Sequence, residues 1–156
     1  MLRALLVVAM VLAPGFARAA DFAWNVGAIE VVGEPGSDHL GVYPYAALSA
    51  VVPVGKVAII PAVGVEWSPE FGHWGFVGTI TADYALGKRV GLDLNVAFIH
   101  DQQDHHWSDA AFLAGGGPGC SFYLDKWTVS PYLSWFQGLN ASGGAIVPGV
   151  NIARTF

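Results

Sequence analysis

The chain is poor in cysteine, in charge and above all in basic residues. Cys120 is its one cysteine among 156 residues, which excludes an internal disulfide. Charged residues make up 12% of the sequence, and seven Lys and Arg face twelve Asp and Glu. The net charge of −5 gives no basic surface of the kind that binds nucleic acid, so no nucleic-acid partner is expected.

Long apolar runs are also missing from most of the chain, although 54% of its residues are hydrophobic and its mean hydropathy is +0.49. Beyond the first 19 residues, no stretch approaches the ~18 consecutive apolar residues that indicate a transmembrane helix. Two classes of protein fit this composition. One is a soluble β protein with a large core, and the other is a barrel whose outer face contacts lipid.

Residues 1–19 have the layout of a secretory signal peptide. Arg3 precedes an apolar run over residues 4–13, and the small-residue pattern Ala-Arg-Ala ends at Ala19. The run is too short for a membrane anchor, because a spanning helix needs ~20 residues. We expect cleavage after Ala19, with residues 20–156 forming one mature domain.

The remaining sequence alternates with a period of two, which predicts β-strands. In "VGLDLNVAF", residues 90–98, large apolar residues alternate with Gly, Asp, Asn and Ala. Other segments repeat this division into a large apolar set and a small or polar set. Because almost no Lys, Arg or Glu occurs mid-strand in the polar set, we assign the large apolar set to lipid and the other set to a lumen.

The connections between these strands alternate in length. Three are short and carry a Lys, and four are longer and polar, which is typical of outer-membrane barrels. We therefore predict an all-β fold, an eight-stranded antiparallel up-and-down transmembrane β-barrel with a lumen filled by side chains. The predicted strands cover residues 22–32, 42–53, 56–67, 74–86, 89–99, 110–124, 127–136 and 145–156.

Aromatic residues gather where these strands end. Two such groups are expected to form belts at the two membrane interfaces, as the interfacial preference of Trp and Tyr requires. The belt at the long-loop ends contains Trp67, Trp74, Trp107 and Trp135, and the belt at the short-turn ends contains Tyr84, Tyr123, Trp127 and Phe156.

The last segment, "VPGVNIARTF", places Val150, Ile152 and Phe156 in one alternating phase. Together with the Pro-Tyr pieces "YPYAAL" and "SPYLSWF", it resembles the small eight-stranded bacterial outer-membrane β-barrels of the OmpA and OmpX type. The resemblance implies a monomer in the Gram-negative outer membrane, in contact with outer-membrane lipid and lipopolysaccharide. It also implies that the barrel-assembly machinery reads the three phased residues as a signal, although Arg154 departs from the usual apolar residue.

Several prolines lie within the predicted strands, where each removes a hydrogen-bond donor from the ladder. We expect them at bulges or outside the paired zone. The glycine-rich piece "GGGPG", residues 115–119, either makes room for large neighbours in the lumen or marks another bulge. These prolines include Pro44, Pro61, Pro118, Pro131 and Pro148.

Asp83 and Asp93 form a predicted polar pair in the lumen. They flank the turn "LGKR", and a three-residue turn at residues 87–89 places them opposite each other. Opposed like charges repel, so a shared proton, a cation or a basic partner would relieve the pair. We interpret it as a hydrated pair near the rim, with a proton- or cation-sensitive plug as the functional alternative.

Motifs for catalysis or metal binding are weak. The stretch "HDQQDHHWSD", residues 100–109, has no fixed ligand spacing, so we interpret it as a solvated outer loop, and no metal or other cofactor is expected. Within it, "HWSDA" resembles the His-x-Ser-Asn-Ala motif of barrels that deacylate lipid A, with His106 as base and Ser108 as nucleophile. No Glu follows Ser108 to orient the histidine.

The sequence favours a structural or surface-interaction barrel that presents four extracellular loops and is not an enzyme. Two alternatives stay open at this stage. One is a hydrolase that modifies lipid A in the outer leaflet through His106 and Ser108. The other is a soluble lipocalin-like barrel that holds a ligand in its lumen.

Overall fold

The computed structural model describes residues 21–31, 41–68, 72–101, 111–138 and 144–155. These ranges contain eight strands, and each boundary lies within two residues of the position expected from the sequence. No helix among the described residues is long and apolar enough to cross a membrane. The strands are β1 (Asp21–Val31), β2 (Gly41–Val54), β3 (Val57–Ser68), β4 (His73–Ala85), β5 (Val90–Asp101), β6 (Ala111–Leu124), β7 (Trp127–Gly138) and β8 (Gly144–Thr155).

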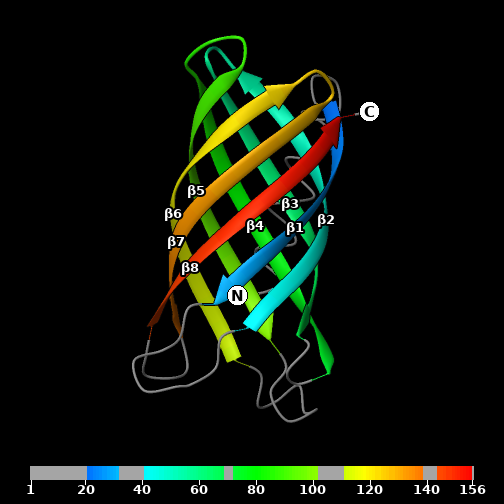
Figure 1. Cartoon of the computed structure of the whole chain (residues 1–156), viewed down its shortest axis with the longest axis vertical. Coiled ribbons are helices and arrows are strands. Elements are labelled where there is room, and N and C mark those ends of the chain that lie inside the picture. The colour runs from blue at the N-terminus through cyan, green and yellow to red at the C-terminus, as the bar shows by residue number, and fades with distance from the viewer. Residues whose placement is uncertain (1–20, 32–40, 69–71, 102–110, 139–143, 156) are drawn as a thin grey trace, which may run out of the picture.

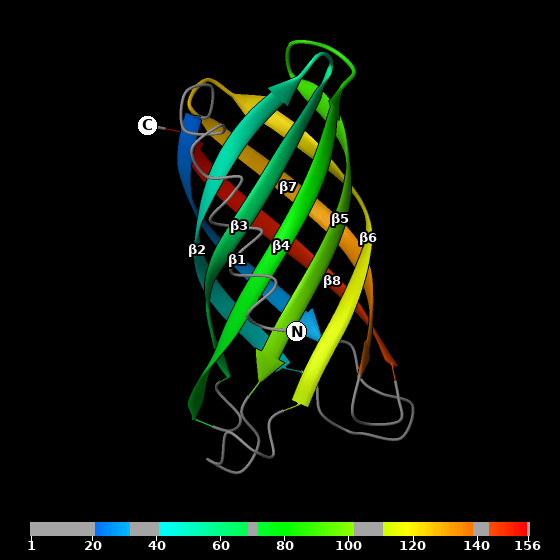
Figure 2. The ribbon, with the colours of Figure 1, turned by 180° about the vertical axis from the view of Figure 1, so that it is seen from behind.

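The eight strands form one closed barrel in the order of the sequence (Figures 1 and 2). Each strand pairs antiparallel with the next, and β8 closes the sheet on β1 from Ala23 opposite Thr155 to Ile29 opposite Gly149. Closure removes the unpaired edges that an open sheet would expose. The predicted all-β, antiparallel, up-and-down architecture is confirmed.

Three short connections lie at one end of the barrel, together with Asp21 and Thr155 (Figure 1). Two of them are two-residue turns that begin with a positive φ, 66° at Gly55 and 57° at Asp125. Gly and Asp enter this region more readily than most residues, which explains the sharp reversals there. The strand ends that lead into the four longer connections lie at the opposite end. We call the two ends the turn end and the loop end.

The prolines do not sit at bulges, and that expectation is wrong. Every described strand pair keeps one register from end to end, so no extra residue is inserted at a proline. Pairing between β6 and β7 skips Pro118 and Pro131 and then resumes in the same register. In an antiparallel ladder a residue hydrogen-bonds with one neighbouring strand at a time. A proline therefore interrupts one side of the ladder and leaves the pairing on the other side in place.

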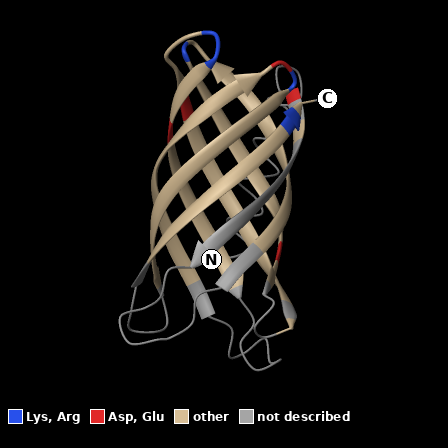
Figure 3. Cartoon of the chain, in the orientation of Figure 1, with Lys and Arg blue, Asp and Glu red and all other residues tan. Residues whose placement is uncertain are grey.

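The two faces of the sheet differ sharply in chemistry. Large apolar side chains point outward and are exposed, including Leu48, Val63, Ile80, Leu94, Val96 and Leu133. The buried polar side chains point inward and comprise Ser49, Glu66, Asp83, Asp93, Ser121 and Ser134. The described Lys and Arg residues gather at the turn end of the barrel (Figure 3), and they are Lys56, Lys88, Arg89, Lys126 and Arg154.

An apolar cluster lies in the lumen toward the loop end. Its buried members are Val77, Ala97, Ile99, Phe136 and Val147, and Tyr45, Leu113 and Tyr132 pack against them. All come from the inward parity of their strands. We call this cluster the apolar plug, because it occupies the part of the lumen that leads toward the longer connections.

Candidate functional site

A cavity of about 520 Å³ occupies the rest of the lumen. Its lining begins at the turn residues Gly55, Lys56 and Asp125 and reaches Ile99 and Phe136 of the apolar plug. The lumen is therefore not filled by side chains throughout, and the sequence-based expectation is corrected on this point. The physical reason is side-chain size, because the inward positions between the turns and the plug are largely small, including Ala47, Ser49, Ala58, Ala62, Thr79 and Thr81.

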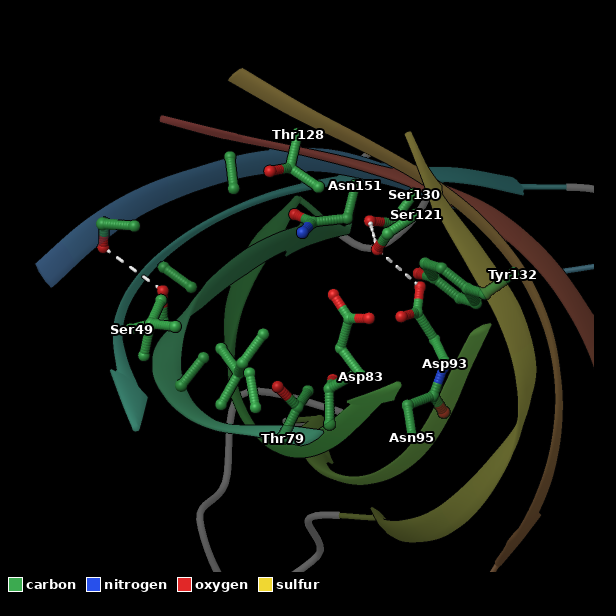
Figure 4. Close-up of a pocket in the computed structure, with 18 of the residues that line it drawn as sticks. Ser49, Thr79, Asp83, Asp93, Asn95, Ser121, Thr128, Ser130, Tyr132 and Asn151 are labelled. Atoms are coloured by element: carbon green, nitrogen blue, oxygen red, sulfur yellow. Dashed lines mark hydrogen bonds between the residues drawn. The ribbon is translucent and has the colours of Figure 1, made fainter. Parts of the chain in front are cut away.

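Asp83 and Asp93 lie opposite each other on β4 and β5 and project into this cavity (Figure 4). Both are buried, with 6% and 8% of their surface exposed. The turn between the strands sets this arrangement, because the backbone N–H of Leu86 donates to the carbonyl oxygen of Val90 at 3.0 Å. Two carboxylates thus face each other inside a narrow lumen, where water screens their repulsion poorly.

Hydroxyl groups are the partners that the described part of the chain supplies to these carboxylates. Tyr123 donates to the two carboxylate oxygens of Asp83, at 2.5 and 2.7 Å. Ser121 lies 2.8 Å from Oδ2 of Asp93 and also 2.8 Å from the hydroxyl of Ser130. Oδ1 of Asp93 is buried and has no hydrogen-bond partner among the described residues. Hydroxyl groups therefore stabilise part of the negative charge on the two carboxylates. No Lys or Arg side chain of the described residues forms an ion pair with them.

Tyr123 does not belong to the aromatic belt, which corrects its assignment from the sequence. It shares the odd parity of β6 with Ser121, so its ring enters the lumen and its hydroxyl reaches Asp83. Gly91 makes this approach possible, because a Cβ at that position would collide with the Tyr123 hydroxyl and the Asp83 carboxylate. Tyr123 was assigned to the belt because it lies near a turn. Its parity along β6 instead gives the correct, inner face.

The other described belt residues lie on the outer surface. Trp67 and Trp74 face each other at the loop end, with ring centroids 5.0 Å apart, and Trp74 and Trp135 are exposed. At the turn end, Tyr84 and Trp127 are exposed, and the guanidinium carbon of Arg154 lies 5.4 Å from the centre of the Trp127 ring. This cation–π contact stabilises the charge of the outward-facing Arg154 at the rim of the barrel.

Several predicted residues lie outside the described residues. These are the signal segment 1–19, His106 and Ser108 of the hydrolase hypothesis, Trp107 of the loop-end belt and Phe156 of the predicted assembly signal. Its other two members, Val150 and Ile152, are on β8 at positions of outward parity.

Sequence reasoning missed the polar groups that surround the carboxylate pair and the buried Glu66. Ser121, Tyr123 and Ser130 come from β6 and β7, far from Asp83 in the sequence. Their inward parity was visible, but which of them reach the carboxylates depends on the register between strands. Tyr45 is another case, since its hydroxyl donates to Oδ1 of Asn151 at 2.9 Å over the inner face of β1, which lies between β2 and β8.

Replacing Asp93 by asparagine is expected to stabilise the barrel by about 1 kcal/mol, since it removes one of two opposed like charges. The new amide oxygen still accepts from Ser121, and the amide nitrogen gains the chance to donate toward Asp83. Urea titration of the folded protein measures the change. Asp21→Asn, at an exposed position on β1, should leave the stability unchanged. A clear loss of stability in Asp93→Asn would show that the charge itself is paired.

Replacing Tyr123 by phenylalanine is expected to destabilise the barrel by about 2 kcal/mol, because the buried Asp83 carboxylate loses its charge-assisted hydrogen bond. The same urea titration reads this loss. Tyr84→Phe, on the exposed outer face, serves as the matched control and should have little effect. Equal effects of the two substitutions would contradict the lumen position of Tyr123.

Comparison with known proteins supports the architecture alone. The sequence matches no protein-family model and no curated protein. Among solved structures, the N-terminal β-barrel domain of Pseudomonas aeruginosa OprF superposes with a TM-score of 0.55 at 13% identity, covering 88% of this chain and 99% of that one. Neisserial surface protein A (NspA) superposes with a TM-score of 0.53 at 8% identity, covering 88% of this chain and 97% of that one.

Both neighbours are eight-stranded outer-membrane β-barrels of the OmpA and OmpX kind. At these identities the likeness concerns the fold and carries no residue from one chain to the other. The resemblance that the sequence suggested is thus confirmed at the level of architecture: this chain has the fold of the small eight-stranded outer-membrane barrels.

Proposed function

We propose that this chain is an outer-membrane protein with a structural or surface-interaction role and without catalytic activity. In this proposal the barrel spans the membrane as a monomer, its outer face contacts lipid, and lipopolysaccharide surrounds the loop end. Export depends on residues 1–19, and the barrel-assembly machinery inserts the chain by reading its last strand.

The observation that carries the proposal is the reversed distribution of polar and apolar side chains. Leu94 is 61% exposed on the outer face, whereas the adjacent inward residue Asp93 is buried. In water, a continuous surface of large apolar side chains would be unfavourable and prone to association. In a bilayer the same surface is favourable, and the closed barrel satisfies its backbone hydrogen bonds internally.

The narrow lumen favours a surface role for this protein over a role in transport. The apolar plug of Val77, Phe136 and their neighbours lies in the lumen toward the loop end. An eight-stranded barrel leaves little room for an aqueous pore even without such a plug. We therefore propose that the functional surface is the set of four longer connections, presented outside the cell, and that the barrel anchors them.

Cell fractionation with an alkaline carbonate wash tests this proposal. We expect the mature protein in the washed outer-membrane fraction, and we expect the unheated sample to migrate differently from the heated one on a gel. Loosely attached proteins leave the membrane in the wash, whereas folded barrels stay. Recovery of the folded protein in the soluble periplasmic fraction would overturn the proposal and favour a soluble barrel.

A further inference from the structure

We propose that the lumen cavity is a binding site for an organic ammonium ion that carries an uncharged apolar chain. The ammonium group lies between Asp83 and Asp93, and the chain extends along the lumen toward the apolar plug. The site follows from the cavity and its lining, so it does not depend on the membrane location proposed above.

The charge of the cavity points to a cation. Two buried carboxylates face each other in the lumen, and Oδ1 of Asp93 has no hydrogen-bond partner among the described residues. Leaving a buried acceptor unpaired is unfavourable, and leaving a buried charge unpaired is more so. A primary ammonium group carries a positive charge and three N–H donors. It could therefore reach Oδ1 of Asp93 and the Asp83 carboxylate together.

The rest of the cavity points to an apolar chain. Of the residues that line it, four are charged: Asp83, Asp93, and the turn residues Lys56 and Asp125. Beyond the carboxylates most of the lining surface is apolar, although Asn95 and Asn151 add polar groups, and the lining ends at Ile99 and Phe136 of the plug. From Asp93 to Ile99 is six residues, which corresponds to a depth of roughly 15 Å at the usual rise and tilt of barrel strands. A chain of medium length fits this depth.

The position of the carboxylates sets the orientation of the ligand. Asp83 and Asp93 lie near the turn end, two to three residues from the turn at residues 86–89. A ligand that enters from this end would pass its chain inward first and keep its ammonium group near the mouth. Lys56 and Asp125 at the mouth carry opposite charges, but the other Lys and Arg residues at the turn end make the rim net positive. The attraction for the ammonium group therefore comes from the buried carboxylates inside the lumen.

A metal ion fits the site less well. Within the described ranges, no three His, Cys, Asp or Glu side chains gather in one place. Calcium takes six to eight oxygen ligands, commonly from several carboxylates and carbonyls. A bare metal ion would also leave the apolar part of the cavity without an occupant. An amine with an apolar chain matches both parts of the site.

Calorimetric titration of the folded barrel with octylammonium tests the proposal, with octanol and octanoate as uncharged and oppositely charged analogues. The protein is held in lipid nanodiscs, and titrations of empty nanodiscs are subtracted to remove partitioning into lipid. We expect saturable one-to-one binding of octylammonium, with octanol and octanoate at least about tenfold weaker.

Variants separate the two parts of the site. Asp83→Asn/Asp93→Asn should weaken octylammonium at least about tenfold, while Asp21→Asn leaves it unchanged. Ala62→Leu, which places a larger side chain in the cavity, should weaken octylammonium but not methylammonium. Unboiled gel mobility confirms that each variant is folded. Equal binding of octanol and octylammonium, binding that survives the double substitution, or a response to Mg²⁺ or Ca²⁺ alone would overturn the proposal.

Discussion

Replacing Phe136 by alanine is expected to lower the free energy of unfolding by roughly 3 to 5 kcal/mol, the usual cost of removing a buried aromatic ring. Phe136 is 4% exposed and belongs to the apolar plug. Its ring occupies the space above Gly115, where a Cβ would collide with it. Alanine would leave a void that neighbouring backbone strands are too constrained to fill. Urea titration of the folded barrel measures the loss.

Phe122 provides the matched control, because it is the same residue type on the outer face of β6 and is exposed. Phe122→Ala should cost about 2 kcal/mol, because the variant loses the transfer of the ring from water to lipid but leaves no cavity, since lipid fills the space. A larger effect at Phe122 than at Phe136 would show that the plug is not the packed part of the molecule.

Replacing Gly117 by alanine is expected to destabilise the barrel by about 3 kcal/mol. A Cβ at Gly117 would collide with the backbone carbonyl oxygen of Leu133 and press on the Cα atom of Ser134. Backbone atoms of a neighbouring strand cannot rotate away, so relief requires the strands to separate. Pairing between β6 and β7 already skips this position, and further separation would disturb the hydrogen bonds on both sides.

Gly87 is the control for this substitution. It lies in the turn between β4 and β5, and a Cβ there would meet nothing within 4 Å. Gly87→Ala should therefore change the stability by less than about 0.5 kcal/mol. Thermal or urea unfolding of the two variants side by side decides the matter, and similar stabilities would contradict the close approach of β6 to β7.

The fold was largely predictable because a membrane barrel repeats one simple pattern. In β5, the outward residues Leu92, Leu94 and Val96 alternate with the inward residues Asp93 and Asn95, and the structure keeps this division. Alternation fixes the face of each residue, and the lengths of the connections fix the direction of each strand. The opposition of Asp83 and Asp93 followed from one short turn.

The cavity and its polar partners were not predictable in the same way. Whether Tyr123 reaches Asp83 depends on the path of β6 beside β5, on the space at Gly91 and on the tilt of both strands. These quantities arise from closing the barrel, and no local pattern in the sequence encodes them. For the prolines, the local preference of the residue predicted bulges, but the closed sheet accommodates the prolines without them.

The carboxylate pair links stability to the proposed ligand site. Asp93→Asn should stabilise the barrel, yet asparagine at both positions should weaken binding of octylammonium at least about tenfold. Residues that lower the stability of a fold are commonly residues that bind a ligand or act in catalysis, because stability alone would not favour them. A gain in stability in Asp93→Asn together with weaker binding in the double variant would support this interpretation.

We infer that the outward residues of each strand face lipid and that the inward residues face the lumen. In a Cys120→Ser background, cysteine is placed at Leu94 or at Asn95, adjacent residues of opposite parity on β5. Each is labelled with bimane, and quenching by lipids brominated in mid-chain is measured. We expect strong quenching at position 94 and little at position 95. Quenching of the label at 94 by aqueous iodide, with no effect of brominated lipid, would contradict it.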